Sequence, residues 1–493
     1  MIKEEFLKLC EKHHLIGSNF VIANASEILE SASFGLMDKE ENIPYSDETI
    51  TRIASISKTV LAIGLMQLQE KGLVDLKEDI SKYLGYYVRN PYFPKDKITL
   101  EMITTQTSSI QDGYDDENPK YDEVIKGYNG INSHSSIDVT LKDLLTNSSS
   151  EYYTIHTFGK YKPGTRWCYS NFGCGIMACI IEKVSGMYYV DYMEENVFKP
   201  LGIVASYKSS LLPQGLPIAT MYSGTCEHEH IYKKENFINS PLKKYELGNN
   251  FRGPAGGLFI TMKDLAKIMQ VFLNYGTLNG VQILKRETVE LMYQMHWCGS
   301  PIGDSYKAKG IQMQILNNHP GYPLRGHTGG AYGVRSYMFF DLRQGLGGCF
   351  ITNGIASTNE SDECQAMFNE SINLFLNEYA HQVSTKAIIR EQEIELKERK
   401  IIDNELFIGH HIKAMHFADA LNTVGEYKED DMEFILPFKH KTLVIKDLVI
   451  FNDIPYIDLE KVLNDLELEF EVFKDHITIL FDTELDNNLI IEN

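Results

Sequence analysis

The chain has 493 residues, of which 43% are hydrophobic, and it is long enough to hold a sizeable core in more than one domain. A formal net charge of −21 argues against binding to nucleic acid or to an anionic membrane, because both ligands reward clustered lysine and arginine. No apolar run approaches the length of a membrane span, and residues 1–15 carry a charged amphipathic pattern without the apolar core or cleavage site of a signal peptide. The eight cysteines have no framework spacing, so we expect a cytoplasmic protein with reduced thiols.

The pattern of apolar residues predicts a mixture of helices and strands. Two strands at residues 19–23 and 30–35 follow the first amphipathic helix and are joined by a short polar turn. Polar residues dominate 111–138, which we interpret as a long surface excursion. We further expect helices starting at residue 98 and covering 172–186, 262–275 and 364–379, and strands at 311–316, 336–340 and 348–352.

The composition changes near residue 381. Beyond it, short β-branched runs alternate with acidic turns. We therefore divide the chain into a domain at residues 1–380 and an acidic, mainly β domain of unknown role at residues 381–493.

The most informative stretch is an apolar segment from Ala54 to Lys71, without proline and followed by Gly72 where a C-terminal cap belongs, which predicts a buried helix. Ser55 opens this helix, close to unpaired N–H groups and the positive end of the helix dipole. Lys58 follows at i+3 on the same face, and an apolar setting favours the neutral amine that can act as a base. The pair predicts an activated nucleophile, although the four-residue spacing also occurs by chance, as at Ser240–Lys243.

Acyl transfer by such a serine needs a second proton carrier, a polar group to orient the substrate, and two N–H donors for the oxyanion. Tyr169 and Asn171 lie just before a buried helix, where both side chains can project into a cleft; alone, the same residues would be a helix cap. The run His327-Thr328-Gly329-Gly330 would let a substrate lie against a strand edge, with the N–H groups of Gly330 and Ser55 as the oxyanion hole. Alone, that run would be a plain hairpin turn.

In this order, the motifs resemble the serine β-lactamase and penicillin-binding-protein superfamily, specifically the class C-like branch that includes D-alanyl-D-alanine carboxypeptidases, D-aminopeptidases and carboxylesterases. Framework segments over roughly residues 15–380 share the resemblance, among them 34–38, 163–167, 200–202, 255–258 and 352–354. The resemblance implies an α+β fold of the β-lactamase/transpeptidase type. This fold has an antiparallel sheet flanked by helices and an all-α subdomain, and the small mainly β C-terminal domain would be added to it.

The resemblance also implies roles for individual residues. Ser55 would be the acylated nucleophile, Lys58 its proton partner, and Tyr169 the acid/base that protonates the leaving group and later activates water. Asn171 would bind the substrate amide, and His327, Thr328 and Gly329 would line the substrate site. His327 stands where β-lactamases of this branch usually carry lysine, and a mostly neutral histidine suits a substrate carboxylate less well, so we expect weak β-lactam turnover.

One departure from the family pattern concerns the turn Gln106-Thr107-Ser108-Ser109, which lacks the usual glycine and leaves its backbone shape open. A metal site at Cys226–His230 is a weaker alternative, because those residues sit between short apolar runs like a hairpin tip. We therefore expect no metal and no cofactor.

The sequence thus predicts a serine hydrolase that acts through an acyl-enzyme on small amides, D-amino-acid-containing peptides or esters. Two alternatives remain open: a β-lactamase that hydrolyses β-lactam antibiotics, and a non-catalytic ligand-binding or sensor protein on the same fold. A small-molecule or peptide substrate is the expected partner, with neither nucleic acid nor membrane, and the sequence does not specify the oligomeric state.

Overall fold

The computed structural model divides into two compact units. Unit 1 comprises Met1–Tyr293, Ile311–Met313 and Arg325–Phe375, and unit 2 comprises Gln294–Gly310, Gln314–Leu324 and Leu376–Asn493. The structure describes residues 2–113, 125–132, 134, 136–223, 230–239, 245–299, 301–316, 324–342, 344–355, 360–384, 389–395, 399–400, 406–407, 411–421, 423–438, 441–451, 454–472 and 476–482. The division at residue 380 that we drew from the sequence stays a prediction.

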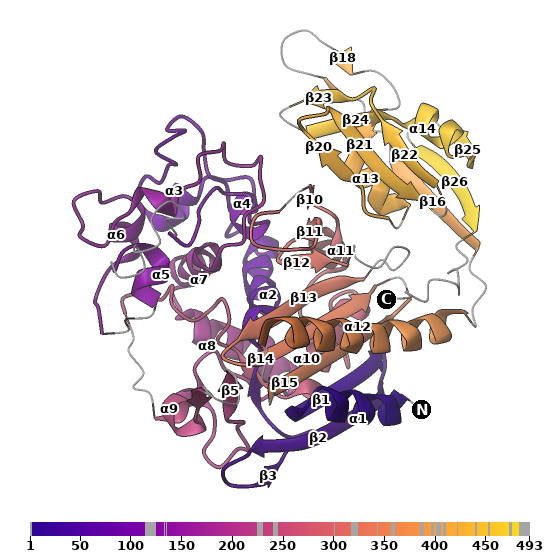
Figure 1. Ribbon diagram of the computed structural model, residues 1–493. Coiled ribbons are helices and arrows are strands. Elements are labelled where there is room, and N and C mark those ends of the chain that lie inside the picture. The colour runs from indigo at the N-terminus through magenta and orange to yellow at the C-terminus, as the bar shows by residue number, and fades with distance from the viewer. Residues whose placement is uncertain are drawn as a thin grey trace. The chain divides into compact units, whose positions relative to one another are not determined.

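Unit 1 is built on an antiparallel sheet in which the N-terminal strands lie beside late ones (Figure 1). Its strand order is β13-β14-β15-β1-β2-β3, so β1 is paired with β15 on one side and β2 on the other. The strands are β1 Leu15–Asn24, β2 Ile28–Asp38, β3 Ile43–Pro44, β13 Arg325–Ala331, β14 Val334–Asp341 and β15 Leu346–Ile355. The strands expected at 19–23, 30–35, 336–340 and 348–352 are confirmed. The sequence had not indicated β13 as a strand, because its three glycines conceal the alternating pattern.

Helices cover both faces of this sheet. On one face, Phe6 of α1 (Ile2–Lys12) stacks on Phe20 of β1, and Phe375 of α12 (Glu360–Ser384) lies beside Tyr337 of β14. On the other face, Phe272 of α10 (Met262–Leu273) stacks on a strand residue of β14 with ring centroids 5.2 Å apart. Both faces of the sheet are therefore covered, and β1 and β15 are buried along nearly their whole length.

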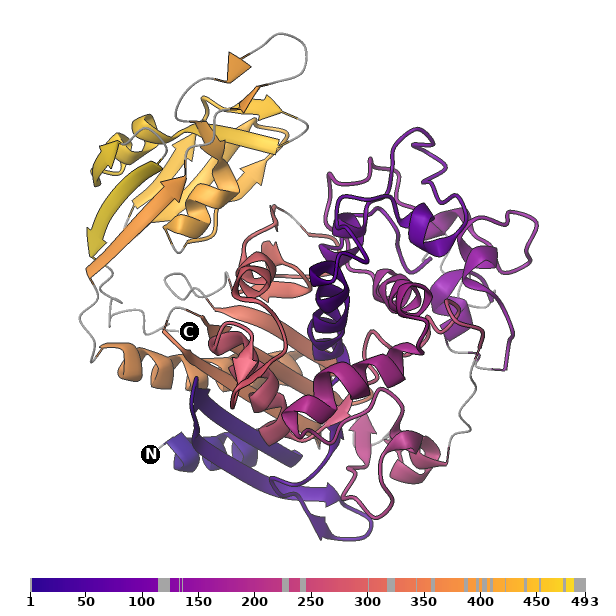
Figure 2. The ribbon, with the colours of Figure 1, turned by 180° about the vertical axis from the view of Figure 1, so that it is seen from behind.

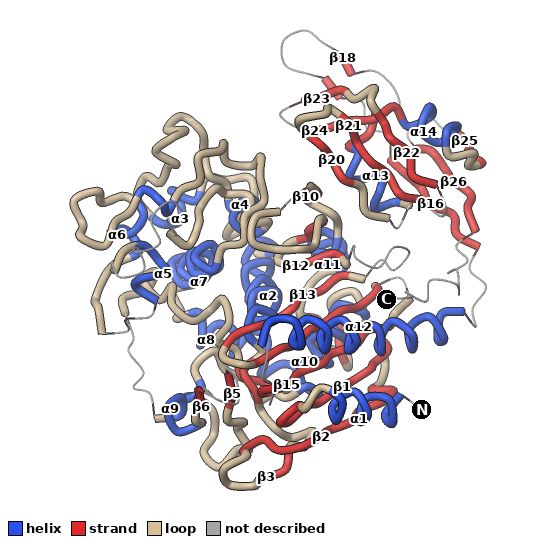
Figure 3. The backbone as a smooth tube through the Cα atoms, viewed as in Figure 1, coloured by secondary structure: helices blue, strands red, loops and turns tan. Residues whose placement is uncertain are grey.

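A mainly helical part of unit 1 is centred on α2 (Ser57–Glu70) and α7 (Asn171–Ser185), which pack against each other (Figure 2). Thr99 caps the short helix α4 (Leu100–Thr104) by accepting the Met102 N–H, and Gly186 ends α7 in a left-handed conformation. Long loops join these helices (Figure 3). The remaining helices of this part are α3 Ile80–Leu84, α5 Gly127–Asn132, α6 Leu141–Leu145 and α8 Tyr189–Met193.

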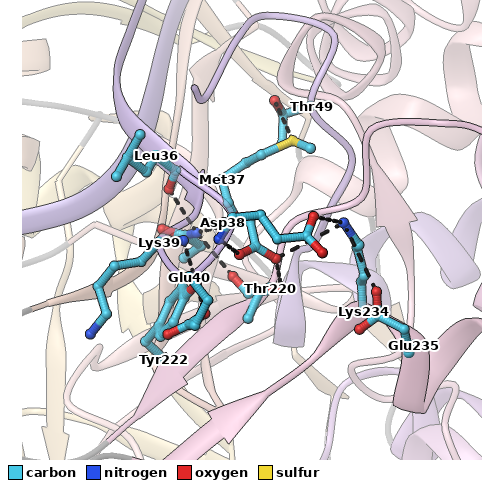
Figure 4. Close-up of polar contacts among 12 residues, drawn as sticks. Leu36, Met37, Asp38, Lys39, Glu40, Thr49, Thr220, Tyr222, Lys234 and Glu235 are labelled. Carbon is cyan, nitrogen blue, oxygen red and sulfur yellow. Dashed lines mark hydrogen bonds and ion pairs between the residues drawn. The ribbon is translucent and has the colours of Figure 1, made fainter. Parts of the chain in front are cut away.

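Short elements complete unit 1. They are β4 Thr51–Arg52, β5 Met221–Ser223, β6 His230–Tyr232, α9 Lys234–Ile238, β7 Phe259–Ile260, β8 Thr277–Leu278, β9 Val281–Gln282 and α11 Arg286–Tyr293. The pair β5–β6 is tied to the turn after β2 (Figure 4). Thr220 donates a 2.7 Å hydrogen bond to the Asp38 carboxylate, and the Tyr222 hydroxyl accepts the Lys39 N–H and donates to Glu40, both at 2.7 Å.

Unit 2 is a small, mainly β unit with its own core. Phe417, Phe434, Ile457 and Leu463 pack there with Met295, which comes from the segment before residue 311. The unit contains β10 Trp297–Cys298, β11 Ala308–Gly310, β16 Ile389–Glu395, β17 Arg399–Lys400, β18 Leu406–Phe407, β19 His411–Lys413, α13 Ala414–Ala420, β20 Glu426–Lys428, β21 Glu433–Phe438, β22 Lys441–Ile445, β23 Val449–Phe451, β24 Ile454–Asp458, α14 Leu459–Asp465, β25 Glu469–Val472 and β26 His476–Asp482. The strand β12 Met313–Ile315 runs across the division between the units in the sequence.

Candidate active site

Ser55 lies in a tight turn between the short strand β4 and helix α2. Residues Ala54–Ile56 form a single 3-10 turn, and Ala54 has a φ of 50°, a left-handed conformation that costs a non-glycine residue about 1 kcal/mol. The Ser57 hydroxyl holds this turn from inside by donating to the Ala54 carbonyl at 2.6 Å and accepting the Leu258 N–H at 3.1 Å. The fold therefore holds the backbone directly before Ser55 in a strained shape.

Two predicted residues, Lys58 and Tyr169, meet at the Ser55 hydroxyl. The Lys58 Nζ donates to Ser55 Oγ at 2.9 Å and to the Tyr169 hydroxyl at 2.8 Å, and that hydroxyl donates to Ser55 Oγ at 2.6 Å. Lys58 is fully buried, and its third N–H group is donated to the Ala255 carbonyl at 2.7 Å. Three mutual hydrogen bonds thus close a ring that links the serine hydroxyl directly to the amine and to the phenol, the two groups predicted to carry its proton.

Asn171 belongs to the same region and is held by a carboxylate that the sequence did not indicate. Its Nδ2 donates to Asp112 Oδ2 at 2.8 Å, while Asp112 Oδ1 accepts the Phe172 N–H at 2.8 Å and the Ser170 hydroxyl at 3.3 Å. Burial raises the pKa of Asp112, although these hydrogen bonds and the charge of Lys58 oppose that shift. An ionised carboxylate can accept hydrogen bonds but cannot donate them. Asp112 therefore binds the nitrogen of the Asn171 amide and leaves the amide oxygen facing away from the carboxylate.

Asp112 was missed because it sits at the beginning of the polar stretch 111–138, which we had interpreted as a surface excursion. Within the described part of that stretch, Asp112 is 5% exposed and Tyr128 is 4% exposed. A single aspartate among many polar residues carries no local signal of burial, since the helix terminus that covers it begins almost 60 residues later.

The predicted run His327–Gly330 lies on strand β13 beside the turn that holds Ser55. A Cβ built on Gly329 would lie 2.4 Å from the Ile53 carbonyl oxygen, so the strand approaches the turn closely because this residue is glycine. The Ser336 hydroxyl, opposite Gly329 on β14, donates to that same carbonyl at 2.9 Å. Gly330 follows directly, and Thr328 precedes at a half-buried position.

His327 is buried and faces the ring of Tyr169, with ring centroids 6.4 Å apart. Its Nδ1 lies 2.6 Å from the Thr328 carbonyl oxygen. A carbonyl oxygen can only accept, so Nδ1 carries a proton. The structure therefore brings His327, Ser55, Lys58, Tyr169 and Asn171 into one site; their chemical roles stay predictions.

The turn that lacks the family glycine keeps a left-handed backbone without it. Ser109 has a φ of 62° and Gln106 a φ of 57°. Ser109 accepts a 2.9 Å hydrogen bond from the Asn90 side chain, and the Gln106 side-chain oxygen accepts the Ser170 N–H at 2.9 Å. These bonds offset part of the strain and connect the turn to the residue before Asn171.

Other features bear on metals and membranes. Of the suggested metal cluster, Cys226–Glu229 lie outside the described residues, and His230 is in β6. Across the part of the chain that the structure describes, there is no group of three or more histidine, cysteine, aspartate or glutamate side chains that could hold a metal ion. The described helices likewise include none that is both long and apolar enough to cross a membrane.

Comparison with known proteins agrees with this geometry. The chain is 29% identical over 201 residues to a penicillin-binding protein from Bacillus subtilis (strain 168), a match that covers 40% of this chain and 39% of that protein. It is 23% identical over 380 residues to a mitochondrial serine beta-lactamase-like protein from Homo sapiens, with 62% and 65% of the two chains covered. The chain thus spans less than two thirds of the length of these curated relatives.

Two solved structures share the fold. The octameric penicillin-binding protein homologue from Pyrococcus abyssi matches with a TM-score of 0.55 at 18% identity, covering 97% of this chain and 99% of that one. The D-amino acid amidase from Ochrobactrum anthropi SV3, solved with L-phenylalanine amide, matches with a TM-score of 0.55 at 19% identity and covers 77% and 97%. The predicted fold class, including the small β part that follows the main sheet, is confirmed.

The family itself is shown by a match over most of the sequence. The family model described as Beta-lactamase matches residues 3–365, which include every residue of the candidate site. This chain therefore belongs to the Beta-lactamase family, within the superfamily of serine β-lactamases and penicillin-binding proteins.

Proposed function

We propose that this protein is a serine hydrolase that acts through an acyl-enzyme on small amides, D-amino-acid-containing peptides or esters. The observation that carries the proposal is the closed ring of hydrogen bonds among Ser55 Oγ, Lys58 Nζ and the Tyr169 hydroxyl, with all three distances between 2.6 and 2.9 Å. A protein that only binds a ligand has no need to bury a lysine against a serine hydroxyl, since that burial is costly.

In the proposed reaction, Ser55 Oγ attacks the substrate carbonyl carbon and its proton passes to the Lys58–Tyr169 pair. The oxyanion that forms is bound by the N–H groups of Ser55 and Gly330. The bond to the leaving group then breaks, and Tyr169 gives that group its proton. Water, activated by the same pair, attacks the acyl-enzyme, and Ser55 recovers its proton as the acid product leaves.

The nature of the substrate is inferred from His327 and from the relatives. A histidine, unlike a lysine, is not a fixed cation near pH 7, so His327 is poorly suited to a β-lactam carboxylate and we expect β-lactams to be poor substrates. Likeness to a D-amino acid amidase supports amides of small acids as the class to test first. The cytoplasmic location inferred from the sequence and the separate C-terminal domain at 381–493 belong to this proposal too.

The proposal is tested by intact-protein mass spectrometry after incubation with a fluorophosphonate and, separately, with a penicillin. We expect an adduct of the fluorophosphonate on the wild type and none on Ser55→Ala, with the penicillin adduct forming slowly. A penicillin adduct that forms and turns over rapidly would favour a β-lactamase. No adduct from folded wild-type protein would refute the hydrolase proposal and favour a binding protein.

A further inference from the structure

Three cationic side chains lie around a glycine-rich turn next to Ser55. The turn spans residues 253–257, and its Ala255 carbonyl is the one that accepts from Lys58. Arg52, three residues before Ser55, donates from Nε to the Gly256 carbonyl at 2.6 Å. A Cβ built on Gly256 would lie 3.5 Å from the Ala54 carbonyl carbon, so the turn and the nucleophile are neighbours.

The second cation is Lys208. It follows Tyr207, whose hydroxyl donates to the Ser57 carbonyl at 2.7 Å, and its Nζ would lie 3.9 Å from a Cβ built on Gly253. The side chain is largely buried, and its Nζ makes neither a hydrogen bond nor an ion pair with any residue that the structure describes. Burial lowers the pKa of Lys208, and the neighbouring charges of Arg52 and Arg252 lower it further.

The third cation is Arg252, directly before the turn. Its Nη2 donates to the Ile137 carbonyl at 3.0 Å and its guanidinium packs against the Phe251 ring, but its buried Nε has no hydrogen-bond partner. Within the described ranges, none of Arg52, Lys208 and Arg252 forms an ion pair with a carboxylate. The charge of Asp138 acts on Arg252 without forming an ion pair with it. Like charges gathered without ion pairs are unfavourable, and they are unexpected in a chain with a net charge of −21.

Of the three cations, only Arg52 and Arg252 donate hydrogen bonds from their charged groups to described residues. Arg52 holds the turn and also lies under the exposed ring of Tyr332, 4.3 Å from the ring centroid, at the tip of the β13–β14 hairpin that follows Gly330. Lys208 has no such contact. A structural role for Lys208 would need an acceptor for its ammonium group, and the described residues provide none.

We propose that Arg52 and Lys208 bind a carboxylate of the substrate, so that the enzyme prefers anionic esters or amides over neutral ones and disfavours cationic ones. This inference rests on the proposed function and specifies its substrate class. In this proposal, the positive charge that binds the substrate lies beside the turn at 253–257, and not on strand β13, where His327 is found. The carboxylate could belong to the acyl group or to the leaving group, and the two are separated by experiment.

The test compares kcat/KM for para-nitrophenyl esters of one length with three charges: the hemiglutarate, the butyrate and the trimethylammonio-butyrate. A second arm uses an acetate ester whose nitrophenol leaving group carries a carboxylate, against plain para-nitrophenyl acetate. In Lys208→Gln, the anionic-over-neutral ratio should fall about tenfold in one of the two arms, as expected for losing one charged hydrogen bond. The cationic-over-neutral ratio should rise.

The matched control is Lys77→Gln, which removes the same charge from an exposed position and should leave all ratios unchanged. General damage to the active site would lower every rate together and would not move the anionic and cationic ratios in opposite directions. Ratios in Lys208→Gln that equal those of the wild type in both arms would overturn the inference while leaving the proposed hydrolase intact.

If no ester acylates Ser55, the proposed function fails and the anion site is tested alone. Isothermal titration calorimetry of glutarate into Ser55→Ala is then compared with the same titration into Ser55→Ala/Lys208→Gln. Binding that weakens about tenfold without Lys208 supports the site. Glutarate binding that is absent, or that does not depend on Lys208, overturns it.

Discussion

Replacing Gly329 by alanine tests whether the close approach of strand β13 to the turn that holds Ser55 is needed for acylation. The new Cβ would lie 2.4 Å from the Ile53 carbonyl oxygen and 2.3 Å from Ser336 Oγ, where real Cβ contacts below 3.0 Å essentially never occur. The serine hydroxyl can rotate away. The Ile53 carbonyl cannot move away in the same manner, because it belongs to the backbone two residues before Ser55. The N–H group of Ile53 is also held, by a 2.9 Å hydrogen bond to the Leu258 carbonyl.

The strand and the turn must therefore separate by about 0.6 Å, and a displacement of order 1 Å in an active site costs roughly 10²-fold in rate. We expect the second-order rate constant for fluorophosphonate labelling of Ser55 to fall by about 10- to 100-fold. Overpacking of this kind costs about 1–3 kcal/mol, which should lower the melting temperature by about 2–6 °C.

Gly330→Ala is the control for stability. A Cβ there would find its nearest neighbour, Arg335, at 3.6 Å, so the methyl group fits, and the melting temperature should be unchanged or higher. Labelling is followed by intact-protein mass spectrometry and unfolding by differential scanning fluorimetry. If Gly329→Ala labels at the wild-type rate and melts at the wild-type temperature, the close approach of β13 has no part in positioning Ser55.

Three further predictions follow from the hydrogen bonds and charges. Tyr169→Phe removes one hydrogen bond to Ser55 and one from Lys58, and should slow acylation by about 10²–10⁴ in stopped-flow assays at unchanged melting temperature; a loss below about fivefold would contradict a proton-transfer role. Asp112→Asn places an N–H group where Oδ2 accepts from Asn171. The Asn171 amide should therefore rotate and present its nitrogen to the substrate, which should raise KM about tenfold while kcat changes little. An unchanged KM would show that the orientation of Asn171 is set elsewhere. In unit 2, burial lowers the pKa of Lys309 to about 8. Between that pH and the ordinary lysine pKa, the unfolded chain binds more protons than the folded chain, so the free energy of unfolding should rise as the pH increases over this range. The rise should reach at most about 1.4 kcal/mol per pH unit and be absent from the double variant Asp304→Asn/Lys309→Met in denaturant titrations; equal slopes in both proteins would contradict it.

Much of the site was predictable because its residues lie in locally defined positions. The helix from Ser57 to Glu70 follows from an apolar run that ends at Gly72. The predicted helix began at Ala54, whereas Ser55 lies in the 3-10 turn just before the observed helix, and its spacing from Lys58 still brings the two side chains together. The caps at Thr99 and Gly186 follow from residue types that satisfy helix ends. These features need no knowledge of the rest of the chain.

Strand β13 and Asp112 show where local patterns failed. Glycines at 326, 329 and 330 weaken a strand signal, and the strand forms because β14 pairs with all of it. Asp112 lies in a polar stretch and becomes buried only when the start of α7 covers it. In both cases the deciding partner is distant in the sequence, so no window of neighbouring residues contains the information.

The sequence by itself determined the family, the nucleophile helix and the residue types of the proposed site, because helix periodicity, capping and the order of short motifs are properties of neighbouring residues. Only the tertiary structure decided that Tyr169 reaches Ser55, that Asp112 holds Asn171, and that Arg52, Lys208 and Arg252 gather without an ion pair to a carboxylate among the described residues. Hydrogen bonds and charge interactions act over a few ångströms. The two hydrogen bonds join residues that are 114 and 59 positions apart in the sequence, and only folding of the chain brings such residues together.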